Sequence, residues 1–233
     1  MSGFTISRVT TLEGRLAPFH WDWADREQAW IEARWASLLA ARPKMFDGRV
    51  LMAHRWALDG DTFRAAYFET RFSRFLSWRE AGRPEGVANC FSMAALRAPD
   101  GAFVLGEMGA HTANAGKIYF PAGTPDPDDL VGDVVDLAGS ALRELGEETG
   151  LGAHDVTAAP EWTIVAGGGM IACMKPMLLA MSAEAAVERI HATLERQTDR
   201  ELARMHIARR RSDLDPARIP PFLAAYLDHE LPA

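Results

Sequence analysis

One amphipathic stretch, residues 136–151, limits the folds open to this 233-residue chain more than any other. Asp136 is a favourable N-cap, because its carboxylate can accept hydrogen bonds from the free amides of a first helical turn. Gly150 is favourable just past a helix end, because glycine enters the left-handed conformation without steric strain. Between them, apolar side chains recur at helical spacing: Leu137, Ala138, Ala141, Leu142 and Leu145. The stretch therefore predicts one helix with a buried face.

A second face of this helix is acidic. Glu144, Glu147 and Glu148 stand at positions i, i+3 and i+4, so their carboxylates lie close together and repel each other. A hard divalent cation removes that repulsion, since Mg²⁺ prefers carboxylate oxygen. We therefore predict that the three glutamates bind Mg²⁺ or Mn²⁺; the alternative is a solvated acidic face. Arg143 is expected to pair with one of these carboxylates and to orient it.

The string from Arg143 to Leu151 resembles the second half of the Nudix box, Arg-Glu-aliphatic-x-Glu-Glu-x-Gly-aliphatic, and matches it at every specified position. The first half departs from the family pattern. Val135 stands where the family has a glutamate, and the preceding glycine corresponds to Gly123, ahead of a longer and acidic loop. One acidic group of the family's set is therefore either missing or replaced, with Asp133 and Asp136 as the candidates.

The resemblance implies an α/β fold, the Nudix α/β/α sandwich with a mixed sheet, over residues 85–233. Residues 1–84 are expected to form an N-terminal α+β extension. The resemblance also implies a Mg²⁺-dependent pyrophosphohydrolase that cleaves a diphosphate linkage in a nucleoside diphosphate joined to another moiety. The acidic loop and the extension are similar to those of Nudix proteins acting on UDP-sugars, which makes a nucleotide-sugar one expected substrate.

The expected site residues follow from the chemistry of the acidic helix face and from the resemblance to the Nudix box. Glu147 and Glu148 are expected to be catalytic, with Arg143 as an orienting group, and a carboxylate is expected to take the proton of an attacking water. That carboxylate could come from the helix or from a later loop, where Glu195 and Glu201 are candidates, although an exposed charged residue is the commoner role. Substrate contacts are expected from Gly123, Asp136 and Glu201.

A rival hypothesis is a Nudix-fold nucleotide-binding or regulatory protein with weak or lost catalysis. Val135, in place of an acid, favours it. Retention of the three glutamates opposes it, because a binding module needs no carboxylate cluster.

The net charge of −7 argues against general binding of nucleic acid or of anionic membranes. It leaves a small phosphorylated substrate open, because a metal ion inverts the local charge. Cys90 and Cys173 lack metal-ligand spacing and fit a reduced compartment, although a bridge between them stays open. The first residues lack a signal-peptide pattern and no apolar run is long enough to span a bilayer, so we expect a cytoplasmic protein. A homodimer is possible.

Periodicity and turn residues predict the remaining elements. Residues 4–16 are expected to form a strand, or a hairpin turning near Glu13 and Gly14, and Gly167–Gly169 a bend or hairpin turn. Six of the seven tryptophans lie in the first third of the chain, and we favour a core role for them over stacking on a base. Helices are predicted at residues 22–41, 70–80, 182–197 and 220–227, and strands at 49–58, 62–68, 87–96, 102–105, 117–120, 162–180 and 201–211.

Overall fold

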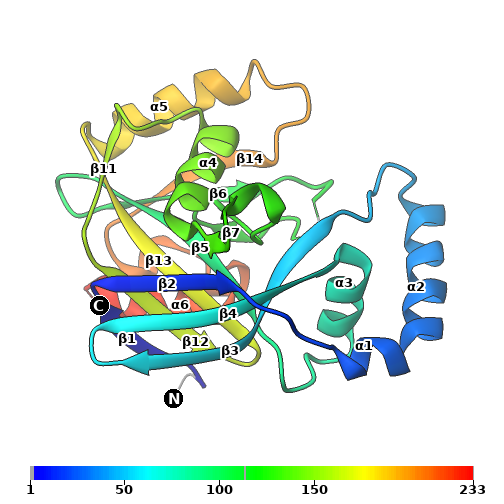
Figure 1. Ribbon diagram of the computed structural model, residues 1–233. Helices are drawn as coiled ribbons and strands as arrows, with labels where there is room; N and C mark the ends of the chain where they lie inside the picture. Colours follow the sequence, from blue (N-terminus) through cyan, green and yellow to red (C-terminus); the bar gives the residue numbers. More distant parts are fainter. Residues whose placement is uncertain (1–2, 113, 233) are drawn as a thin grey trace.

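The computed structural model describes residues 3–112 and 114–232, which form two β-sheets and the helices around them (Figure 1). The first sheet has the strand order β1-β12-β13-β5-β6-β14, with β11, β7 and β8 paired to β13, β6 and β5. Its strands are β1 (Thr5–Val9), β5 (Asn89–Arg97), β6 (Phe103–Met108), β7 (Ile118–Tyr119), β8 (Ala122–Gly123), β11 (Val156–Ala158), β12 (Trp162–Gly167), β13 (Met170–Leu179) and β14 (Leu202–Ala208).

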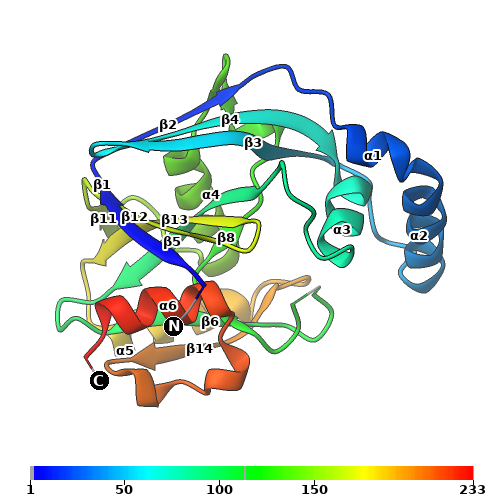
Figure 2. The ribbon, with the colours of Figure 1, turned by 90° about the horizontal axis from the view of Figure 1, so that it is seen from below.

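Helices cover both faces of this sheet. The helix α6 (Pro221–Glu230) lies on one face, and α4 (Leu137–Thr149) and α5 (Ala183–Leu194) lie on the other (Figure 2). Successive side chains of β5 point to opposite faces of the sheet. Phe91 and Met93 pack in the core beside α6, and Ala94 and Leu96 pack in the core beside α4 and α5. β5 runs parallel to β13 and antiparallel to β6 and β8, so the sheet is mixed. The predicted α/β/α arrangement with a mixed sheet is confirmed.

The helix predicted over residues 136–151 is α4. The Asp136 carboxylate accepts a hydrogen bond from the Gly139 amide at 2.9 Å, and Gly150 ends the helix with a φ of 73°. Leu137, Ala141 and Leu145 are buried. Both ends and the buried face are therefore as the sequence predicts.

A second sheet packs beside α4, with the order β3-β4-β2-β10-β9. Its strands are β2 (Thr11–Leu16), β3 (Arg49–Asp59), β4 (Thr62–Arg71), β9 (Leu130–Val131) and β10 (Val134–Val135). β9 and β10 come from the acidic loop before α4, and β10 pairs with β2 through Val134 and Arg15. The acidic loop thus belongs to the same sheet as the N-terminal strands.

The predicted hairpin near Glu13 and Gly14 is wrong. β1 and β2 lie in different sheets: β1 pairs antiparallel with β12, and β2 pairs parallel with β4. Each strand finds its partner far away in the sequence, which local alternation cannot reveal. The division at residue 84 stays a prediction, and each sheet takes strands from the other side of it.

The outer face of β3 and β4 carries α1 (Asp22–Arg26), α2 (Gln28–Ala41) and α3 (Phe72–Glu80), on the right of Figure 1. The helix predicted at residues 22–41 is interrupted at Glu27. The core role favoured for the tryptophans holds for Trp21 and Trp78, which are buried in this cluster, and in part for Trp23 and Trp35, which pack against it. It is wrong for Trp30 and Trp56, which are exposed. Among the residues that the structure describes, no helix is long and apolar enough to cross a membrane.

The capping role of Asp136 can be measured. We expect Asp136→Ala to lower the free energy of unfolding by about 1 kcal/mol, because the Gly139 amide loses its acceptor. Urea denaturation measures this, with Asp128→Ala in the exposed part of the preceding loop as the matched control. Equal stability of the two variants would show that the cap does not stabilise α4.

Candidate functional site

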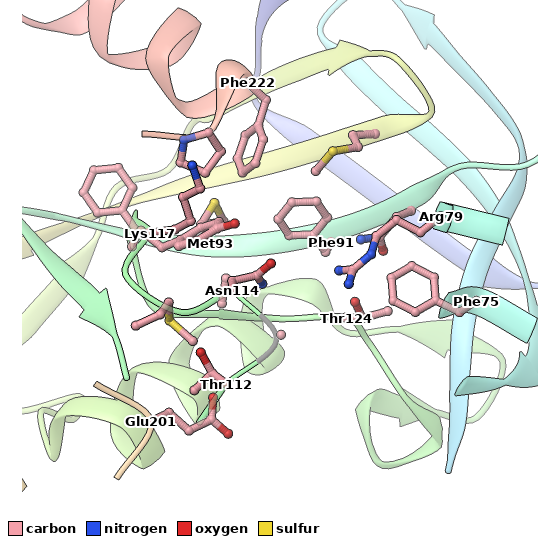
Figure 3. A pocket seen from close by; sticks show the side chains of 18 of the residues that line it. Phe75, Arg79, Phe91, Met93, Thr112, Asn114, Lys117, Thr124, Glu201 and Phe222 are labelled. Atoms are coloured by element: carbon pink, nitrogen blue, oxygen red, sulfur yellow. The ribbon is translucent and has the colours of Figure 1, made fainter. Parts of the chain in front are cut away.

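Two cavities meet at the acidic face of α4. The smaller has a volume of about 320 Å³, and the larger, of about 1130 Å³, extends toward α3 and α6. Glu144, Glu148 and Glu201 line both of them, and Glu147 lines the smaller one. Figure 3 shows part of the larger cavity, with Glu201 at its acidic end. The structure therefore brings together the three predicted metal ligands and two carboxylates from a later segment, Asp199 and Glu201.

Glu148 is buried, with a relative exposure of 7%. Burial raises the pKa of its carboxyl group to about 8, opposed by a hydrogen bond from the Ala122 amide and reinforced by the charges of Glu144, Glu201 and Glu147. The Ala122 amide lies 3.2 Å from Glu148 Oε1. At neutral pH and without a cation, this group is largely protonated.

Glu144 lies in a similar environment. Burial raises the pKa of its carboxyl group to about 7; the Arg143 guanidinium opposes this shift, and neighbouring carboxylates add to it. For Glu144, burial and the neighbouring carboxylates thus outweigh the positive charge of Arg143.

Gly123 of β8 determines how closely the chain approaches Glu144. A Cβ added at Gly123 would lie 2.2 Å from Glu144 Oε1. Gly123 also lines the larger cavity, where it was expected to contact the substrate. Through Gly123 and the Ala122 amide, β8 therefore contacts both Glu144 and Glu148.

Arg143 is held by a buried acid. Its Nη2 lies 3.1 Å from Oδ1 of Asp129, whose side chain is only 2% exposed. Its Nη1 lies 3.0 Å from Glu144 and 3.2 Å from Glu147. The predicted orienting role of Arg143 agrees with these contacts, although Arg143 itself lines neither cavity.

The acid expected to replace the missing glutamate was misassigned. Asp133 pairs with Arg15 on the surface at 2.9 Å, and Asp136 caps α4. Asp129 instead contacts Arg143, while Val135 is buried in the core between the sheets. Local sequence could not reveal this, because the loop forms the β9–β10 pair before it reaches the helix.

Two other candidates lie outside the cavities. Asp136 lines neither of them, so its predicted substrate contact is replaced by the capping role. Glu195 is exposed at the end of α5 and also lines neither cavity.

Within residues 3–112 and 114–232, no group of three or more His, Cys, Asp and Glu is already arranged to hold a metal ion. The donor set still fits a hard divalent cation. Four glutamates line one small cavity. Mg²⁺ needs only one or two of these carboxylates, because it keeps several waters. A bound cation would also allow Glu144 and Glu148 to ionise.

Several lining residues carry no sequence signal that would have identified them. Gln197, Thr198 and Asp199 line the smaller cavity. The larger one is lined by Thr112, Asn114 and Lys117 from the loop after β6 and by Arg79 and Arg83 at the end of α3. These residues come together only through the tertiary fold.

No protein-family model matches the chain, and no curated protein matches it in sequence. Two solved structures are similar to part of it. A Nudix hydrolase from M. smegmatis, RenU, is 20% identical with a TM-score of 0.39, covering 61% of this chain and 84% of its own. The MutT protein from Methanosarcina mazei Go1 is 16% identical with a TM-score of 0.38, covering 59% and 88%. Both likenesses are distant, so the function has to be inferred from this chain's own residues.

The two raised pKa values predict how stability depends on pH. A carboxyl group whose pKa is raised by folding contributes stability at low pH that is lost as the pH rises through the folded-state pKa. In the presence of EDTA, we expect the free energy of unfolding to fall by on the order of 3 kcal/mol between pH 5.5 and 8.5. Glu148→Gln should remove most of this fall, as measured by urea denaturation at each pH. An unchanged pH dependence in the variant would contradict the assignment.

Because Gly123 lies so close to Glu144, adding one methyl group at position 123 should strongly affect metal binding. Gly123→Ala must displace the Glu144 carboxylate, so we expect it to weaken Mn²⁺ binding by about tenfold or more. Electron paramagnetic resonance of free Mn²⁺ measures the affinity. Gly152→Ala is the matched control, because a Cβ there meets nothing within 4 Å. Equal Mn²⁺ affinity in both variants would refute the role of Gly123.

Proposed function

We propose that this chain is a metal-dependent Nudix hydrolase that cleaves a diphosphate linkage in a nucleoside diphosphate joined to another moiety. The observation that carries the proposal is a pair of carboxylates in the wall of a cavity of about 1130 Å³: Glu148, which is buried, and Glu144, which is partly buried. Buried carboxylates whose pKa values are raised toward neutrality are typical of functional sites. The cavity is large enough for a nucleotide with a second group attached, such as a nucleotide-sugar.

Glu144, Glu147 and Glu148 are the residues that would hold Mg²⁺ or Mn²⁺. When bound, the cation would neutralise charge on the phosphates, polarise the phosphorus centre and lower the pKa of a water. The intact second half of the box supports this donor set. The surroundings of Glu148 support it as well, since that carboxyl group otherwise stays protonated near neutral pH.

Two further groups of residues would orient the metal ligands and accept the proton of the attacking water. Arg143, held by Asp129, orients the carboxylates of Glu144 and Glu147. Glu201 is our candidate for the general base that takes the proton of the attacking water. It lines both cavities and comes from a segment other than the helix that supplies the metal ligands.

The rival hypothesis of a binding protein with lost catalysis depended on Val135. Asp129, an acid from the same loop, contacts Arg143 as Glu144 and Glu147 do. We propose that Asp129 supplies the acid that is absent at position 135, which supports the hydrolase over the binding protein.

Glutamine substitutions test the proposal. We expect Glu147→Gln and Glu148→Gln each to lower kcat by about 10²-fold or more, because each removes a negative charge from the metal site. The assay follows phosphate-containing products from nucleotide-sugars, dinucleotides and nucleoside triphosphates with Mg²⁺. Circular dichroism checks that each variant is folded.

Glu195→Gln is the matched control, since this glutamate lines neither cavity. Its turnover should equal that of the wild type. Full activity in both box variants would refute the proposed hydrolase. Absence of turnover in the wild type, together with a lack of Mn²⁺ binding, would favour the rival binding protein.

A further inference from the structure

The larger cavity has a second charged end, which the proposed hydrolytic chemistry does not use. The helix α3 supplies Phe75 and Arg79 to its wall, and the turn that follows supplies Arg83. In Figure 3, Arg79 lies beside Phe75 and Phe91, well away from Glu201. The cavity therefore runs from an acidic end at α4 to a basic end at α3.

The two arginines lack an acidic partner. Within the described part of the chain, neither Arg79 nor Arg83 forms an ion pair, although both are only half exposed. Glu80, the acid next to Arg79, is bound by Arg34 at 2.6 Å. A guanidinium group binds phosphate through several N–H donors, so two arginines without a carboxylate partner beside a cavity favour an anionic ligand.

Their surroundings favour an anion as well. The positive charge of Arg79 adds to burial in lowering the pKa of Arg83, so the two guanidinium groups repel each other. Tyr119 lies near enough that both arginines oppose the rise in its pKa that burial causes. An anion between them would remove the repulsion, and the phenol could donate a hydrogen bond to it.

The backbone holds Arg83 in an unusual conformation. Its φ is 60°, and no other non-glycine residue among those that the structure describes has a positive φ. Its amide donates to the Trp78 carbonyl oxygen at 3.0 Å, which closes the turn after α3. Its side chain lies against Gly169, where an added Cβ would be 3.0 Å from Arg83 Cβ. Glycine would adopt this φ without strain. The presence of arginine at a strained position therefore suggests that its side chain has a function.

We propose that Arg79 and Arg83 bind a second phosphate group of the substrate, a phosphomonoester beyond the diphosphate that is cleaved. This inference rests on the proposed function of the glutamates and names the substrate class. The substrate is a nucleoside diphosphate derivative with an additional terminal phosphate. The apolar side chains of Phe91, Met93 and Phe222 line the cavity between its ends and face the uncharged part of the ligand.

Binding measured without turnover tests this proposal separately from hydrolysis. The probes are adenosine 2′,5′-bisphosphate and adenosine 3′,5′-bisphosphate, each compared with adenosine 5′-monophosphate by isothermal titration calorimetry. We expect the wild type to bind at least one bisphosphate about tenfold or more tightly than the monophosphate, because a guanidinium–phosphate pair is a strong charged contact. The preferred probe identifies the position of the phosphate.

The variants are Arg79→Met and Arg83→Gly, singly and together. Arg83→Gly removes the guanidinium and relieves the backbone, so it should fold at least as well as the wild type. In the double variant, the ratio of the bisphosphate affinity to the monophosphate affinity should fall to about one. Arg26→Met, at an exposed arginine that lines neither cavity, should keep it.

Three outcomes would overturn the proposal: no bisphosphate preference in the wild type, the same preference in the double variant, or equal weakening of all three probes. The last would mean that the arginines bind a phosphate common to every nucleotide. If the bisphosphate preference is present but no diphosphate is hydrolysed, the phosphate site stands and the proposed hydrolase fails. If a diphosphate is hydrolysed but the bisphosphate preference is absent, the proposed hydrolase stands and the phosphate site fails.

Discussion

The ion pair of Arg143 with Asp129 is the interaction on which the arrangement of the acidic residues depends. A carboxylate as buried as that of Asp129 is stable only beside a charged partner. Arg143 provides that partner, and through its other terminal nitrogen it contacts Glu144 and Glu147. One guanidinium thus joins the loop before α4 to the carboxylates on α4. The fold of this loop and the charge balance of the site are coupled for this reason.

The loop is itself held by the N-terminal part of the chain. β10 pairs with β2, and the Leu51 amide at the start of β3 donates to the Pro125 carbonyl oxygen at 2.7 Å. From the same part of the chain, α3 forms a wall of the larger cavity. The site therefore draws on both sides of residue 84. Support for the metal ligands and recognition of the ligand come from segments that the box motif does not include.

Features that depend on neighbouring residues could be predicted from the sequence. The helix α4, its caps and its acidic face follow from side chains within four positions of one another. Partners set by tertiary pairing could not be predicted: residues 4–16 were expected to form one strand or a hairpin, and Asp129 was passed over in favour of Asp133 and Asp136. Arg79 and Arg83 belong to no motif, since only the packing of α3 against β3 and β4 of the second sheet brings them to the cavity.

The opposite charges at the two ends of the cavity have a consequence for how a ligand binds. An anionic group entering from solvent is attracted to Arg79 and Arg83, whereas the acidic end offers it no positive charge unless a cation is bound there. Apolar walls between the ends keep the effective dielectric low, which strengthens that attraction. A ligand with phosphates at both ends can therefore occupy the whole cavity only when the acidic end carries a cation. If the proposed cation and the proposed substrate are correct, we expect charge, more than shape, to make binding of the full substrate depend on the metal.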